Sequence, residues 1–191
     1  MFYQDIDDEL QLAIILPHHA AALYTLVDQN RDYLKEWLPW LDATTEQQHV
    51  AAYIKSAVAQ MADGRGLTCL VVLQAKIVGV VSYNSIDSST KTGSIGYWLD
   101  KDHNGKGLMT KSVEKLIEIG FGELGLRKVE IRCAVGNTKS RSIPERLGMK
   151  EEGVIRNTEN LYGRYVDHVV YGMMRDEWKP NRKVRGACCG M

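Results

Sequence analysis

Residues 96–110 read Gly-Tyr-Trp-Leu-Asp-Lys-Asp-His-Asn-Gly-Lys-Gly-Leu-Met-Thr, and they are the most informative stretch of the chain. An apolar strand pattern comes first, then a short polar loop, and then a glycine-rich helix start. Glycines let the backbone approach an anion closely, and the free amides and dipole of a helix start favour negative charge. We therefore expect Gly105, Lys106 and Gly107 to hold a phosphate group, although a plain helix cap explains a Gly-x-Gly pattern equally well.

Two common nucleotide-binding patterns do not fit this stretch. The P-loop pattern GxxxxGK[ST] is absent, and GxGxxG fails because Thr110 stands at the place of the third glycine. The stretch also follows several expected strands instead of opening a first βαβ unit, which argues against a dinucleotide-binding fold.

Away from this stretch, short extended runs alternate with helical stretches. We expect strands at 10–16, 67–73, 77–86, 93–100, 128–134, 149–161 and 164–175. We expect helices at 18–30, 31–40, 106–121 and 138–147. A further helix should begin at a capping box formed by Thr45 and Gln48 and end at Gly64. Short turns between strands favour antiparallel pairing. The prediction is an α/β domain of the α+β type, with a mixed, mostly antiparallel sheet of about seven strands.

Two helices carry more detailed expectations. The helix at 106–121 repeats apolar side chains on one inner face: Met109, Val113, Leu116, Ile117 and Phe121. The helix at 138–147 has two good capping residues, Asn137 and Ser140. Pro144 favours the later start at Ser140, because proline is tolerated best in the first turn.

The composition indicates one globular domain. Lys plus Arg and Asp plus Glu each total 24 in 191 residues, so the basic excess typical of nucleic-acid binding is absent. We expect a domain over 1–178 and a flexible tail over 179–191. The chain lacks a signal-peptide pattern and a membrane-length apolar run, and its cysteines have no zinc spacing. These features predict a cytoplasmic, metal-free protein that binds neither nucleic acid nor membrane.

Several motifs, in order, resemble one family. Gly96 to Asp100, followed by Gly105-Lys106-Gly107, is similar to the acetyl-CoA signature of the GNAT superfamily of N-acetyltransferases. Asn137-Thr138-Lys139-Ser140 and Glu145-Arg146-Leu147-Gly148 resemble its second motif. Trp37-Leu38-Pro39-Trp40 and the closing stretch 171–178 resemble the RimL/RimJ-like branch, the ribosomal-protein N-terminal acetyltransferases. The match runs from about Leu10 to Trp178.

The resemblance implies a GNAT fold with helices on both faces of a twisted sheet. It also implies a V-shaped splay between the fourth and fifth expected strands, which admits acetyl-CoA as cosubstrate. The cofactor-binding residues that it implies are Tyr97, Trp98, Leu99, Asn104, Gly105, Lys106, Gly107, Leu108, Met109, Thr110, Asn137 and Ser140. The chain departs from the family at Asp102, where Arg or Gln is usual.

The resemblance further implies Glu159 as the base that deprotonates the acceptor amine and Ser140 as the donor to the leaving sulfur. A solvated strand-edge carboxylate and a helix-starting serine are the alternatives for these two residues. Trp37, Trp40 and Tyr162 would lie at the acceptor site, while the alternative for the tryptophans is a role as core anchors. One tyrosine of the final hairpin would help the leaving thiol.

The expected function is therefore acetyl-CoA-dependent transfer of acetyl to a primary amine by direct attack in a ternary complex. The branch favours the N-terminal α-amino group of a ribosomal protein as the acceptor. Acetylation of a small amine (an antibiotic, a polyamine or an amino-acid conjugate) and a non-catalytic acyl-CoA-binding module are the alternatives. The branch also suggests a homodimer.

Overall fold

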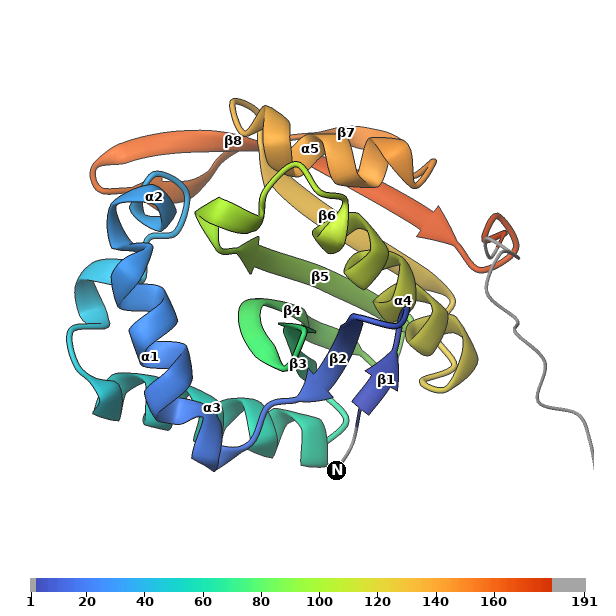
Figure 1. The fold of residues 1–191 in the computed structure, drawn as a ribbon. Coiled ribbons are helices and arrows are strands. Elements are labelled where there is room, and N and C mark those ends of the chain that lie inside the picture. Colours follow the sequence, from blue (N-terminus) through green and yellow to red (C-terminus); the bar gives the residue numbers. More distant parts are fainter. Residues whose placement is uncertain (1–2, 180–191) are drawn as a thin grey trace, which may run out of the picture.

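The computed structural model describes residues 3–179, which form an eight-stranded sheet in the order β1-β2-β3-β4-β5-β6-β8-β7 (Figure 1). The strands are β1 Tyr3–Asp5, β2 Leu10–Ile14, β3 Leu67–Leu73, β4 Lys76–Asp87, β5 Thr92–Leu99, β6 Lys128–Ala134, β7 Lys150–Leu161 and β8 Arg164–Met174. Only β5 and β6 pair in parallel. The seven predicted strands are confirmed, but the total is one too low. The missed strand, β1, is three exposed residues long, too short to show an apolar alternation.

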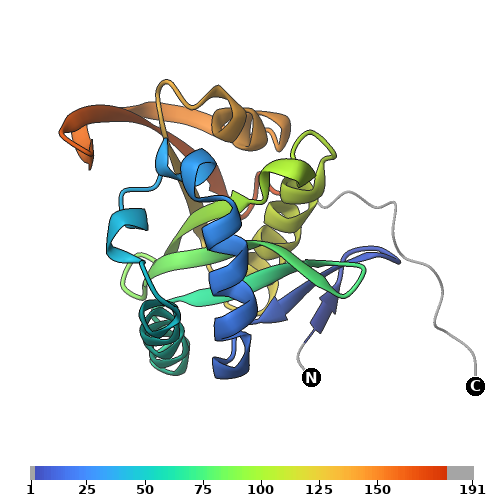
Figure 2. The same cartoon turned by 60° about the vertical axis from the view of Figure 1, so that its left-hand side comes forward.

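Helices cover both faces of the sheet, as predicted (Figures 1 and 2). They are α1 Ala20–Gln29, α2 Arg31–Lys35, α3 Gln47–Ala62, α4 Leu108–Gly122 and α5 Thr138–Arg146. The α4 helix packs on one face and contributes to the larger apolar core, while α1 and α3 enclose a second core on the opposite face. All five residues of the predicted inner face of α4 are buried, which confirms that stripe.

Several helix boundaries differ from the predictions. The capping box at Thr45 and Gln48 is wrong: α3 begins after Glu46, and no side chain caps it. The amide of Thr45 instead donates to His49 Nδ1 over 3.2 Å. The second helix ends at Lys35, before the predicted end, and the Trp37 and Leu38 amides then both donate to the Leu34 carbonyl.

The start of α5 also differs. Asn137 is the N-cap, and its Oδ1 accepts a hydrogen bond from the Ser140 amide over 3.1 Å, so the predicted start at Ser140 is wrong. Pro144 therefore lies inside the helix, where it has no N–H to donate to the carbonyl of Ser140. That carbonyl accepts a hydrogen bond from the Tyr97 hydroxyl over 2.9 Å. A tertiary contact thus compensates for the proline, which sequence reasoning could not foresee.

The splay between β5 and β6 is confirmed. The two strands pair only from Thr92–Ile95 to Lys128–Ile131 and then separate. Gly96 to Leu99 keeps β4 as its partner on one side, and no described strand pairs with its other side. The far end of the β7–β8 hairpin lies above α2 in Figure 1, where the Tyr162 hydroxyl donates to the Leu38 carbonyl over 2.8 Å. The fold thus leaves an opening in the sheet with the hairpin on its far side.

Candidate active site

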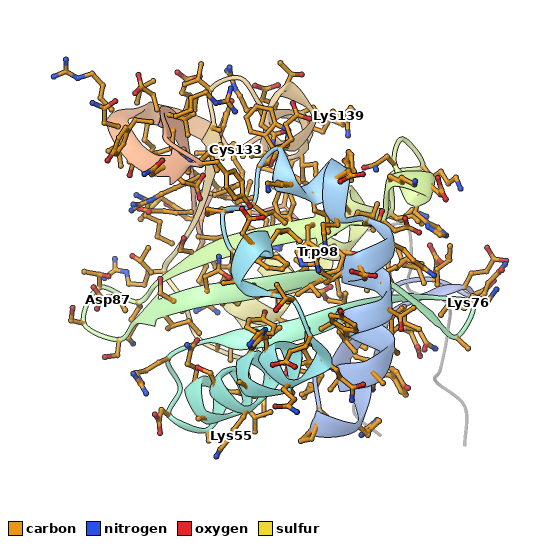
Figure 3. The ribbon with its side chains drawn as sticks, turned by 90° about the vertical axis from the view of Figure 1, so that its left-hand side faces the viewer. Lys55, Lys76, Asp87, Trp98, Cys133 and Lys139 are labelled. Carbon is orange, nitrogen blue, oxygen red and sulfur yellow. The ribbon has the colours of Figure 1, made fainter. Side chains whose placement is uncertain are left out.

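A cavity of about 920 Å³ opens at the splay. Its wall is formed by α1, α2 and the segment after them, by β4, β5 and β6, by the start of α5 and by the β7–β8 hairpin. Figure 3 views the molecule from the α1–α3 side, with Trp98 near the middle of the sheet and Cys133 and Lys139 above it. Trp98, Cys133 and Lys139 all belong to the cavity wall. Segments that are far apart in sequence therefore meet around one space.

The start of α4 is an open backbone cradle beside this cavity. Gly105 and Gly107 have φ angles of +77° and +74°, the left-handed region that favours glycine. A Cβ built on either residue would have no atom within 4 Å. Within the described chain, none of the amides from Gly105 to Thr110 has a hydrogen-bond acceptor. Free amides at a helix start, with open space before them, fit the pyrophosphate of a coenzyme.

A cluster of three polar side chains bridges the splay. The Ser140 hydroxyl donates to the Tyr97 hydroxyl oxygen over 3.3 Å, and it lies 3.2 Å from Cys133 Sγ. Burial raises the pKa of Tyr97 well above its ordinary 10.0, and it also raises the pKa of Cys133 above 9.0. Both groups therefore stay protonated at neutral pH. The Tyr97 proton is engaged by the Ser140 carbonyl, which leaves the Ser140 hydroxyl as the adaptable donor of the cluster.

A carboxylate–imidazole pair forms another part of the wall. Glu159 Oε2 on β7 lies 3.0 Å from His168 Nε2 on β8, and their side chains are 28% and 15% exposed. Both residues line the cavity. A partly shielded carboxylate in a cavity fits the geometry of a general base. Glu159 lies on the edge strand β7, and its carboxylate is only partly exposed.

Aromatic side chains line the α2 side of the cavity. Trp37 and Trp40 belong to its wall, and neither is part of an apolar core, so the interpretation as core anchors is wrong. Tyr162 lies outside the wall and closes the rim by its bond to Leu38 and by a Lys35 ammonium 4.7 Å above its ring.

The residues that the resemblance implies fall into two groups in the structure, those that line the cavity and those that do not. Tyr97, Trp98, Leu99, Asn104, Met109, Asn137, Ser140 and Glu159 line the cavity. Gly105, Lys106, Gly107, Leu108 and Thr110 form or adjoin the cradle at the start of α4 and do not line the cavity.

Sequence reasoning missed two side-chain roles. They are those of His168 and of the Tyr97 hydroxyl, because no local spacing signals a contact between distant segments. The hydroxyl of Tyr171 bonds to Arg141 and Glu145 outside the cavity wall, so it does not reach Ser140.

The described residues were also compared with the requirements of a membrane-spanning helix and of a metal site. No helix within residues 3–179 is long and apolar enough to cross a membrane. In the same part of the chain, no three His, Cys, Asp or Glu side chains have an arrangement that could hold a metal ion. Of the predicted tail, residues 180–191 lie outside the described residues.

Comparison with known proteins agrees with this geometry. Residues 10–150 match the acetyltransferase (GNAT) domain. This chain belongs to the GNAT family of N-acetyltransferases. Its cosubstrate is acetyl-CoA, which agrees with the open cradle and the splay.

Three similar proteins have informative descriptions. The ribosomal-protein-serine acetyltransferase of Escherichia coli (strain K12) is 28% identical over 171 residues, which are 90% of this chain and 96% of that protein. A structure of RimL, a ribosomal L7/L12 α-N-protein acetyltransferase, holds coenzyme A in a disulfide with one of its cysteines. It has a TM-score of 0.89 and 28% identity, and it covers 92% of this acetyltransferase and 99% of RimL.

The third protein is the microcin C7 self-immunity acetyltransferase MccE, solved with acetyl-CoA and AMP. It has a TM-score of 0.84 and 31% identity, and the match covers 88% of this acetyltransferase and 94% of that chain.

Proposed function

We propose that this acetyltransferase acetylates the N-terminal α-amino group of a protein, with a ribosomal protein as the acceptor. The observation that supports the proposal most is the single cavity that contains both the Ser140 cluster and the Glu159 carboxylate. The Ser140 hydroxyl, which lies beside the Cys133 sulfur, can donate a hydrogen bond to the leaving sulfur of CoA. The Glu159 carboxylate can accept a proton from the acceptor amine. Acetyl transfer needs a group of each kind. The acceptor class rests on RimL and the Escherichia coli relative, which are both described as acting on ribosomal proteins.

In this proposal the cradle and the splay hold acetyl-CoA. The amides from Gly105 to Thr110 bind its pyrophosphate, together with the dipole of the fifteen-residue α4. The free side of Gly96 to Leu99 binds the pantetheine arm as an added strand would, and Asn137 contacts that arm. This arrangement directs the thioester toward Ser140 and Cys133. In the RimL complex, CoA likewise lies within bonding reach of a cysteine of that protein.

The chemistry then needs two protons removed from the acceptor nitrogen and one leaving group stabilised. Glu159 takes the proton from the acceptor ammonium, so that the neutral nitrogen can attack the thioester carbonyl carbon. A C–N bond forms, the tetrahedral oxyanion collapses, and the C–S bond breaks; the second proton leaves the nitrogen and goes to the departing sulfur, so that CoA leaves as the thiol. The Ser140 hydroxyl turns from Tyr97 to donate to that sulfur. Tyr97 and Asn137 hold the first turn of α5, and with it Ser140, in place.

A small amine is the second candidate acceptor. MccE is as similar in sequence as the ribosomal enzymes and was solved with AMP, and this cavity has an aromatic wall that includes Tyr33, Trp37 and Trp40. Aromatic faces stack well on planar rings such as nucleobases. An amino-acid conjugate with a planar group is therefore the small-amine class that the wall favours.

An acceptor screen distinguishes these proposals. Peptides with ribosomal-protein N-termini and a panel of small amines are incubated with acetyl-CoA, and both CoA release and acetylated product mass are measured. Turnover of peptides, and its loss when the peptide N-terminus is blocked, supports the first proposal. Turnover of small amines alone would contradict the first proposal.

Glu159→Gln tests the assignment of the base with the preferred acceptor. Unchanged turnover near neutral pH would remove Glu159 from that role. A parent protein that binds acetyl-CoA and turns over no amine would favour a non-catalytic acyl-CoA-binding module.

A further inference from the structure

His168 is a titratable side chain in the cavity wall that the proposed mechanism leaves without a role. Its Nε2 lies 3.0 Å from Glu159 Oε2, and its side chain is 15% exposed. In the described chain, this is the only hydrogen bond of its ring. On the neighbouring strands, His168 stands between Ala134 of β6 and Ile155 of β7, both apolar. The residues paired with His168 on both neighbouring strands therefore offer its imidazole no polar side chain, and its hydrogen bond goes to the Glu159 carboxylate.

An irregularity in β7 creates this contact. The register passes from Ile155↔His168 to Glu159↔Val166, so three residues of β7 face one residue of β8. A continuous ladder would place Asn157 opposite Val166. The two extra residues preserve the alternation of faces and bring Glu159 to that position instead. Glu159 thereby becomes the diagonal neighbour of His168, a separation that long side chains can bridge.

The irregularity is held by specific contacts. Asn157 has a φ angle of +50°, a left-handed conformation that asparagine tolerates better than most residues. Its amide donates to Asp167 Oδ1 over 2.9 Å, and Asp167 is the single β8 residue that faces the insertion. Strained backbone of this kind persists where the surrounding structure holds it, and it concentrates at functional sites.

We infer that His168 is a positioning residue for acetyl transfer, acting through Glu159. This inference rests on the proposed role of Glu159 as the base. With Nε2 protonated, His168 donates to Oε2 of Glu159, and this bond fixes the orientation of the carboxylate. Oε1 is then left to accept the proton from the acceptor ammonium. The proton moves from the amine nitrogen to Oε1 and no further bond changes, so His168 neither gains nor loses a proton in the step.

This role requires the imidazole to supply a hydrogen-bond donor to Glu159. A donor at the position of Nε2 is sufficient, because His168 does not touch the substrate in this scheme. Glutamine carries an N–H donor at the end of a planar group of similar reach, whereas alanine has none. A bond that only held the hairpin together would affect stability and would leave the catalytic rate constant of the folded protein unchanged.

The test compares His168→Ala, His168→Gln, Glu159→Gln and the double variant Glu159→Gln/His168→Ala in the full chain. The matched control is His18→Ala, an exposed histidine outside the cavity wall. We expect His168→Ala to lower kcat about tenfold, the loss expected for one hydrogen bond to a charged group. The KM for acetyl-CoA should stay unchanged, and His168→Gln should recover most of kcat. In the Glu159→Gln background, His168→Ala should cause no further loss.

Several results would overturn the inference. They are an unchanged kcat for His168→Ala, a Gln variant as slow as the Ala variant, or a full additional loss in the Glu159→Gln background. A second measurement needs no turnover: ¹⁵N NMR of the His168 ring in the parent and in Glu159→Gln. The Nε2 signal should shift when the carboxylate is lost, and an unchanged signal also overturns the inference. Failure of the proposed function is a different observation, the absence of turnover in the parent with every amine.

Discussion

Ser140→Ala separates the catalytic role of Ser140 from its structural role. The hydroxyl makes two weak contacts, at 3.3 Å to Tyr97 and 3.2 Å to Cys133, while the cap of α5 uses only the backbone amide of Ser140. Losing one neutral hydrogen bond costs about 0.5–1.5 kcal/mol. The better helix propensity of alanine offsets about 0.5 kcal/mol of that loss. The net change in unfolding free energy is therefore below about 1 kcal/mol, or a Tm shift of at most about 2–4 °C.

The expected loss of activity is much larger. A donor to the leaving sulfur contributes on the order of 10²-fold, so Ser140→Ala should lower kcat by that factor while its affinity for acetyl-CoA is kept. Asn137→Ala should behave differently, because it removes the cap. It should lower stability by about 1 kcal/mol and weaken acetyl-CoA binding. Asn137→Ser should restore the stability, since serine also caps helices.

The assays are CoA release at saturating acetyl-CoA, calorimetric titration with acetyl-CoA, and thermal melting. Ser142→Ala is the matched control, because Ser142 lies on the same helix outside the cavity wall. A Ser140→Ala variant with full kcat would refute the catalytic role. A Ser140→Ala variant that melts lower than Asn137→Ala would refute the assignment of Asn137 as the cap.

Three further predictions concern the cradle, the core and the thiol. Gly107→Ala should destabilise the protein by about 1–2 kcal/mol through its positive φ alone, while Gly107→Glu should also abolish acetyl-CoA binding in calorimetry; binding by the Glu variant would move the phosphate site elsewhere. Gly120→Ala would place a Cβ against the Tyr83 hydroxyl and should cost about 1–3 kcal/mol in denaturant unfolding, partly relieved by Tyr83→Phe; a parental midpoint would contradict this. CoA disulfide should form a mixed disulfide with Cys133, releasing one CoA thiol. Because burial raises the thiol pKa above 9.0, the rate followed by intact mass should climb as pH rises past neutrality; modification of the buried Cys69 instead would place the CoA thiol elsewhere.

The order and type of most elements could be predicted from the sequence, because they depend on local periodicity. The inner face of α4 is one example: five apolar residues at helical spacing are all buried. The glycines of the cradle are another, since their positive φ angles are a local property of the residue type. The family motifs also lie within short, continuous segments, so their resemblance led to the correct fold and cosubstrate.

The tertiary structure decided the features that join distant segments. Pro144 was read as a sign of a later helix start, but the Tyr97 hydroxyl, 47 positions earlier in the chain, supplies the hydrogen bond that lets the helix begin at Thr138. His168 had no functional signal in the sequence, because its contact with Glu159 depends on two extra residues in the pairing of β7 with β8. Local patterns predict which faces are buried, whereas the register between strands decides which polar side chains meet in the cavity.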